Sequence, residues 1–232
     1  MLLCEGQILL VRIWHLPMFS SFLIGIGLLS AVNVISPTPQ AQPPVVVAEH
    51  VMPLDDRYPV KSVSDVFKDN ILLTLAYLRG TVKDGSKIDW TDVEKPFTYS
   101  FTLQPGQVFA FHQDVLPQYA GEVAVTTHAH FNSTDGFKSD GYLVGDGVCH
   151  LASLFNWVGK ESGLETVAPT NHDFAVIPDV PKKFGAAIYF DPGSTAGNAQ
   201  QNVYIKNTRS EPVTFVITYK NDVLTLDITQ AQ

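Results

Sequence analysis

Residues 145–156, with the sequence GDGVCHLASLFN, join a glycine-framed loop to the start of an amphipathic helix, and this stretch indicates how the rest of the chain folds. Gly145 and Gly147 tolerate the unusual φ angles of a tight loop, so the helix is expected to run from about Val148 to Ser162. Apolar positions at helical spacing predict one face that packs on a sheet. These positions are Val148, Leu151, Ala152, Phe155 and Val158.

A second, more polar stripe follows the same helix at positions i, i+4 and i+7, with Cys149, Ser153 and Asn156. The unpaired N–H groups and the dipole of a helix start favour a thiolate, so this position predicts that Cys149 is a nucleophile with a lowered pKa. Ser153, Asn156 and the flanking Asp146 and His150 are then expected to contact the substrate, with His150 at the rim of the site. The alternative is a small, buried and unreactive cysteine.

Two cysteines occur in the chain, Cys4 and Cys149, and they lie on opposite sides of a long apolar segment. We therefore expect no disulfide bond between them and a lone thiol in the C-terminal part. A cysteine nucleophile needs an imidazole to accept its proton, and His172 is the natural candidate. Asp191, which follows a strand expected over residues 186–190, is the expected carboxylate that orients the imidazole. A loop histidine bonded to backbone and an ordinary turn aspartate are the alternatives for these two residues.

His128 and His130 lie two residues apart in a strand expected over residues 123–131, which places both side chains on one face. That spacing suits two zinc ligands and defines a further alternative, a zinc-dependent hydrolase. No His-Glu-x-x-His motif and no cysteine pair accompany them in the sequence, so solvated strand histidines are the favoured interpretation. We accordingly expect no metal ion and no cofactor.

The run GDGVCHLASLFNWVGKESGLE at residues 145–165 resembles the central pattern of the VanW-like family, Gly-Gly-Gly-Val-Cys-Gln followed by a helix that ends in Gly-Leu. FTLQPGQVFAF at 101–111 is similar to that family's Pro-Gly-Glu-x-Phe-Ser-Phe element, and Asn171-His172 to its histidine-containing segment. The resemblance extends over about residues 64–228. It implies a cell-envelope setting and, through the family's name, a link to glycopeptide (vancomycin) resistance.

The chain departs from the family pattern at three places near the cysteine. Asp146 stands for a glycine, His150 for a glutamine, and Gly185 stands near the position where the family carries an aspartate before alanine. The last departure leaves the third catalytic residue open, because a residue role can be carried over only onto a matching position.

Residues 16–35, LPMFSSFLIGIGLLSAVNVI, form an apolar segment long enough to cross a bilayer as a helix. Arg12 precedes the segment and Arg57 is the next arginine or lysine after it, a charge asymmetry that predicts an inside N-terminus and an outside C-terminal part. Residues 1–42 are therefore expected to be a signal peptide or a membrane anchor with a proline-rich linker. Cleavage, which gives a secreted protein, and permanent anchoring both stay open.

The remainder predicts one exported α+β domain over about residues 60–230, in which the cysteine-bearing helix packs on an antiparallel sheet. The order cysteine, histidine, acid is that of papain-like and transglutaminase-like enzymes, so a fold of that kind is one expectation. The formal net charge is -8 and no lysine or arginine cluster occurs, which argues against a nucleic-acid partner. The expected elements are a helix over 62–79, a hairpin of 97–103 with 107–111, and strands over 186–190, 203–206, 213–219 and 223–228.

Two classes of function follow from these observations. The first is a cysteine-dependent acyl-transfer enzyme (amidase, peptidase or transpeptidase) that acts on peptidoglycan through Cys149. The second is a non-catalytic envelope module that binds wall peptide or glycan while Cys149 stays buried. Thiol reactivity separates the two classes. The substrate and the oligomeric state are not encoded in any motif of the sequence.

Overall fold

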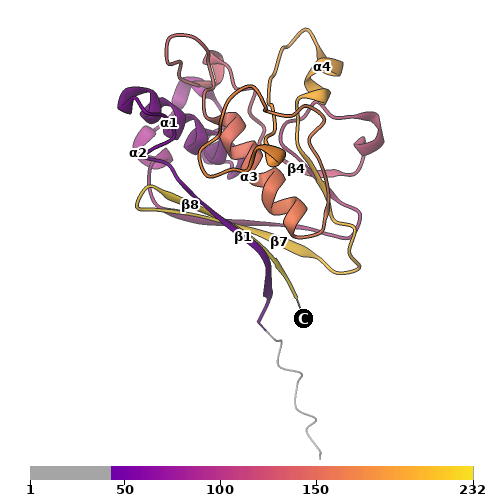
Figure 1. The fold of residues 1–232 in the computed structure, drawn as a ribbon. Coiled ribbons are helices and arrows are strands. Elements are labelled where there is room, and N and C mark those ends of the chain that lie inside the picture. The colour runs from indigo at the N-terminus through magenta and orange to yellow at the C-terminus, as the bar shows by residue number, and fades with distance from the viewer. Residues whose placement is uncertain (1–42, 232) are drawn as a thin grey trace, which may run out of the picture. The chain divides into compact units, whose positions relative to one another are not determined.

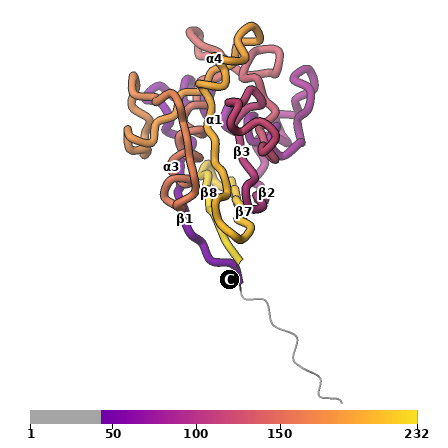
Figure 2. Tube along the Cα trace, turned by 90° about the vertical axis from the view of Figure 1, so that its right-hand side faces the viewer, coloured from indigo at the N-terminus to yellow at the C-terminus, as the bar shows by residue number. Residues whose placement is uncertain are grey.

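The computed structural model describes residues 43–231, which form an α+β fold with two four-stranded sheets (Figure 1). The longer helices, α1 and α3, lie against these sheets, and α4 lies at the end of the fold opposite to the C-terminus (Figures 1 and 2). The elements are β1 Val45–Pro53, α1 Lys61–Leu78, α2 Trp90–Val93, β2 Phe97–Leu103, β3 Val108–Ala110, β4 Val123–Thr126, α3 Val148–Glu161, β5 Glu165–Val167, α4 Thr195–Gln200, β6 Tyr204–Lys206, β7 Val213–Lys220 and β8 Val223–Gln230.

The first sheet has the strand order β1-β8-β7-β2 and is antiparallel throughout. Its β7–β8 hairpin is the C-terminal hairpin expected from the sequence. Asn221 and Asp222 close it with φ angles of 53° and 58°, the left-handed conformations that a tight two-residue hairpin turn requires. Along β7 buried and partly exposed side chains alternate, because one face of this sheet covers the core.

The second sheet has the order β4-β3-β6-β5, with β3 and β4 parallel. The predicted hairpin of 97–103 with 107–111 is therefore wrong, since β2 pairs with β7 in the first sheet and β3 pairs with β4 and β6 in the second. The turn between them is held by Asn207. Its side-chain amide donates to the carbonyl of Leu103, and its own carbonyl accepts from Gly106. The turn thus carries the chain from one sheet to the other.

Two further strand predictions are wrong in their extent. The strand expected over 123–131 ends at Thr126, because His128 and Phe131 have φ angles of 61° and 56°, which break the alternation of a strand. Residues 186–190 are extended but pair with no strand among the described residues. Their backbone groups bind side chains of α3 instead.

Strand β1 was not expected, and it extends the folded part upstream of residue 60. It pairs with β8 from Val45 opposite Gln230 to Pro53 opposite Val223. The domain expected over 60–230 therefore has an additional strand upstream, Val45–Pro53.

The core connects α3 to both sheets through stacked aromatic rings. Phe155 of α3 stacks on Phe109 of β3, with ring centroids 4.9 Å apart. Phe109 in turn stacks on Phe101 of β2 at 5.4 Å, and Phe101 on Phe215 of β7 at 4.7 Å. All five residues of the predicted apolar stripe of α3 are buried, and α3 contacts β1 and β8. The prediction of an α+β fold with the cysteine helix packed on an antiparallel sheet is confirmed.

Within residues 43–231, no helix combines the length and apolar character needed to cross a membrane. The apolar segment 16–35, predicted to be a signal peptide or an anchor, lies outside the described residues.

Candidate functional site

The polar stripe of α3 makes hydrogen bonds to the backbone of residues 184–188. The side-chain amide of Asn156 donates to the carbonyl of Phe184 at 2.8 Å. The Ser153 hydroxyl accepts from the N–H of Ala186 at 2.9 Å and donates to the carbonyl of Cys149. Ser153 and Asn156 are fully buried, so the structure gives these two residues a structural role in place of the substrate contact expected from the sequence.

Cys149 occupies the end of the same stripe and contacts the backbone of Ile188. The N–H of Ile188 lies 3.4 Å from the sulfur, and the sulfur lies 3.6 Å from the carbonyl oxygen of Ile188. Burial raises the pKa of the Cys149 thiol to about 11, an effect that the backbone hydrogen bond from Ile188 opposes and that the charge of Asp146 reinforces. The lowered pKa expected from the helix start is therefore wrong, because desolvation outweighs the N–H groups of the helix.

Cys149 lines a cavity of about 290 Å³ together with both histidines that the sequence placed near it, His150 and His172. Asp146 and Arg57 also line this cavity. Large apolar side chains surround it with most of their surface open to solvent. They include Leu143, Phe174, Val176 and Tyr189, which are 67%, 76%, 90% and 57% exposed. A cavity with a few inward polar groups and an exposed apolar rim is typical of a binding site.

The two imidazoles of the cavity are buried and lack a partner on one nitrogen. His150 and His172 are 5% and 7% exposed, and the Nδ1 atom of each has no hydrogen-bond partner within residues 43–231. Burial, helped by Arg57 and His172, lowers the pKa of His150 to about 3. Burial also lowers the pKa of His172. Both rings are therefore neutral at pH 7. His150, expected at the rim of the site, lines the cavity as a buried residue.

The two predicted carboxylates differ in their surroundings. Asp146 lines the cavity, and burial together with the charge of Asp140 raises its pKa to about 6. The Asp191 carboxylate accepts the N–H of Gly193 at 2.9 Å, the turn contact that was the alternative for this residue. No contact between Asp191 and His172 is found in the described part of the chain, so the orienting role of Asp191 stays a prediction without geometric support.

Arg57 is the polar residue of the cavity that the sequence did not indicate. The sequence marked it only as the first arginine or lysine after the apolar segment, whereas in the structure it is 1% exposed. Its guanidinium pairs with Asp179 at 2.6 Å and with Asp56 at 3.1 Å. An arginine followed by a helix gives no local signal of burial, since burial depends on the packing of residues more than a hundred positions away.

The VanW like protein family model matches residues 98–229, from β2 to β8, which is more than half of the chain. The chain belongs to the VanW-like protein family. No curated protein and no solved structure matches it. The matched range contains Cys149, His150 and His172, whereas β1, α1 and Arg57 lie before it. Because no solved structure matches, the expected likeness to papain-like enzymes is not confirmed.

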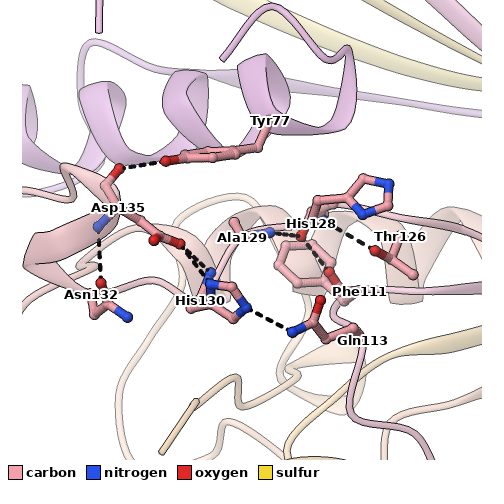
Figure 3. A network of polar contacts seen from close by, with 10 residues as sticks. Tyr77, Phe111, Gln113, Thr126, His128, Ala129, His130, Asn132 and Asp135 are labelled. Carbon is pink, nitrogen blue, oxygen red and sulfur yellow. Dashed lines mark hydrogen bonds and ion pairs between the residues drawn. The ribbon is translucent and has the colours of Figure 1, made fainter. Parts of the chain in front are cut away.

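The zinc alternative finds no support in this VanW-like protein. The Nδ1 atom of His130 lies 3.0 Å from the Asp135 carboxylate, and its Nε2 atom accepts from Gln113 at 2.7 Å. Figure 3 shows that the ring of His128 points away from the ring of His130. In the described part of the chain, no group of three or more His, Cys, Asp or Glu side chains could hold a metal ion.

Proposed function

We propose that this VanW-like protein is a cell-envelope enzyme that transfers acyl groups of wall peptides through Cys149, with His172 as the base. The observation that carries the proposal is the convergence of a free thiol and two buried imidazoles, each with an unpartnered nitrogen, on one cavity. A nucleophile and a neutral imidazole in one cavity are the minimal set for acyl transfer by a cysteine. The family supplies the envelope setting.

His172 suits the role of base better than His150. A base with a pKa of about 3, such as His150, holds a proton too weakly to accept one from a thiol. His172 belongs to an exposed loop next to Phe174 and has its pKa lowered to a smaller degree. The Phe174 ring packs against the His172 imidazole at the cavity, with the two ring centroids 4.0 Å apart.

The resting pair is a neutral thiol and a neutral imidazole. The thiol pKa is about 11 and the His172 pKa lies below its ordinary value of 6.5. The raised thiol pKa and the lowered imidazole pKa both disfavour a preformed thiolate–imidazolium pair. The proton therefore has to move to the imidazole while the sulfur attacks.

The reaction then balances in two steps. The sulfur attacks the amide carbon, a C–S bond forms, and the imidazole takes the thiol proton. The C–N bond breaks, and the leaving amine takes the proton from the imidazolium, which leaves a thioester on Cys149. Water or a second amine next attacks the thioester and loses a proton to His172. The His172 imidazolium then gives that proton to the sulfur as the C–S bond breaks.

A non-catalytic module that binds wall peptide or glycan is the second candidate. The raised thiol pKa favours it, as does the exposed apolar rim. Incubation of the full-length protein with purified wall muropeptides separates the two candidates. We expect an acyl adduct on Cys149 in the intact mass, no adduct in Cys149→Ala, and slower formation in His172→Gln. His128→Gln is the matched control. Muropeptide binding without any adduct or new peptide product would leave only the binding module.

We further propose that the domain lies outside the cytoplasm, secreted or anchored through residues 1–42. The support is the apolar segment 16–35, with Arg12 before it and no lysine or arginine after it until Arg57. Protease added to intact cells should digest an anchored domain, and a cleaved form should appear in the medium. Recovery of the full-length chain from the cytosol alone would contradict the proposal.

A further inference from the structure

The buried guanidinium of Arg57 has one nitrogen, Nε, that makes no hydrogen bond to the described part of the fold. Its Nη1 atom donates to the carbonyl of Pro178 at 3.1 Å, and its Nη2 atom contacts the carboxylates of Asp56 and Asp179. The Nε–H is buried and has no acceptor within residues 43–231. The two partner carboxylates are 66% and 51% exposed. They therefore hold the guanidinium from the solvent side, while its stem is enclosed.

Arg57 is part of the wall of the Cys149 cavity, which includes a second side chain with a buried, unpartnered nitrogen. Arg57 and His150 both line the cavity, and the unpartnered Nδ1 atom of His150 is on a ring that is 5% exposed. The ring of Phe67 meets the His150 ring edge-on at 5.0 Å and fixes its position. Buried polar atoms without a partner are costly and rare. The Nε–H of Arg57 can only donate, and the neutral His150 ring can place its proton on Nδ1, so the pair suits a ligand that supplies acceptor oxygens.

We propose that Arg57 and His150 form a subsite for a carboxylate of the substrate. Together with the proposed acyl-transfer function, on which this part rests, the subsite makes the protein selective for peptides with a free carboxylate near the reacting amide. Arginine is always charged and its N–H groups match carboxylate oxygens. A neutral imidazole adds one N–H. Asp146 also lines the cavity, and an amide N–H next to the ligand's carboxylate suits that acceptor.

N-acetylalanine tests the subsite, because it combines a carboxylate with one adjacent amide, and N-acetylalaninamide is its uncharged control. Each compound is titrated into the full-length protein at pH 7, and affinity is measured from the shifts of the histidine ring resonances. Loss of a charge-assisted hydrogen bond predicts that the carboxylate binds about tenfold or more tightly than the amide. The largest shifts should belong to His150.

Two variants check the residues. Arg57→Lys keeps the charge but removes the Nε–H, and His150→Gln keeps a neutral donor of another geometry. Each should reduce the preference for the carboxylate about tenfold, whereas His128→Gln should keep it. If Arg57→Lys fails to fold, His150→Gln alone decides. Equal affinity of the two compounds for the wild-type protein, or an unchanged preference in His150→Gln, would overturn the subsite.

The outcome is independent of catalysis. Binding is measured in Cys149→Ala as well, where the carboxylate preference should persist. A carboxylate preference in wild-type protein that forms neither an acyl adduct nor a new peptide product from muropeptides would refute the enzyme and keep the subsite. An acyl adduct without any carboxylate preference would refute the subsite and keep the enzyme.

Discussion

Replacement of His150 by glutamine should make the fold more resistant to acid. In the folded protein the pKa of His150 is lowered to about 3 by burial and by the nearby charge of Arg57, whereas the unfolded chain takes up a proton near pH 6.5. The stability that depends on the neutral ring is therefore complete above pH 6.5 and is lost as the pH falls. The loss is about 2 kcal/mol at pH 5 and about 4 kcal/mol at pH 3. Glutamine binds no proton, so the variant avoids this loss.

Urea unfolding followed by tryptophan fluorescence at pH 7 and pH 5 measures the effect. The variant loses the edge contact of His150 with Phe67 and should be less stable than wild type at pH 7 by about 1 kcal/mol. Between pH 7 and pH 5 it should lose about 2 kcal/mol less than wild type does. His128→Gln is the control, because His128 is exposed and should keep the wild-type pH dependence. Equal losses in wild type and His150→Gln would refute the burial argument.

Three other predictions concern the same site. Because its pKa is about 11, Cys149 should react with iodoacetamide about a hundredfold or more slowly than a free cysteine at pH 7, and its rate should still rise above pH 9. Alkylation rates measured by mass spectrometry that reach a plateau near pH 8 would contradict this. Ser153→Ala should lower the free energy of unfolding by about 1–3 kcal/mol, because the buried N–H of Ala186 loses its acceptor. An unchanged urea midpoint would show that this hydrogen bond adds no stability. Asp146→Asn should raise the urea midpoint at pH 7 but not at pH 3. The pKa of this carboxyl is raised to about 6 in the folded protein, so its ionisation above about pH 4 destabilises the fold, and asparagine does not ionise. A lower midpoint at pH 7 would contradict this reasoning.

The parts of the fold that follow from short stretches of sequence were predictable. The β7–β8 hairpin needs only two alternating runs and a two-residue turn at Asn221 and Asp222. Helix α3 needs only its apolar spacing and its glycines. The pairing of β2 and β3 was not predictable, because the turn between them reads as a hairpin and only the distant Asn207 directs it across the two sheets. β1 was missed because its partner β8 lies at the other end of the chain.

The candidate site shows the same division between local and distant information. The sequence placed Cys149 at a helix start and named His172 as its partner, and both line one cavity. The direction of the Cys149 pKa shift could not be predicted, since a helix start lowers a thiol pKa whereas burial in the folded protein raises it. Arg57 was missed for a related reason. Its burial depends on the loop that carries Pro178 and Asp179, which no spacing near Arg57 reveals.

The polar stripe of α3 also explains why the thiol is so well held. Side chains at i, i+4 and i+7 lie along one face of a helix, and Cys149, Ser153 and Asn156 contact the backbone of Ile188, Ala186 and Phe184 in this order. The sulfur thus occupies the place of a structural hydrogen-bonding group. On the proposed acyl-transfer function, the sulfur has to give up its contact with Ile188 when it attacks, whereas the hydrogen bonds of Ser153 and Asn156 can keep residues 184–186 in place.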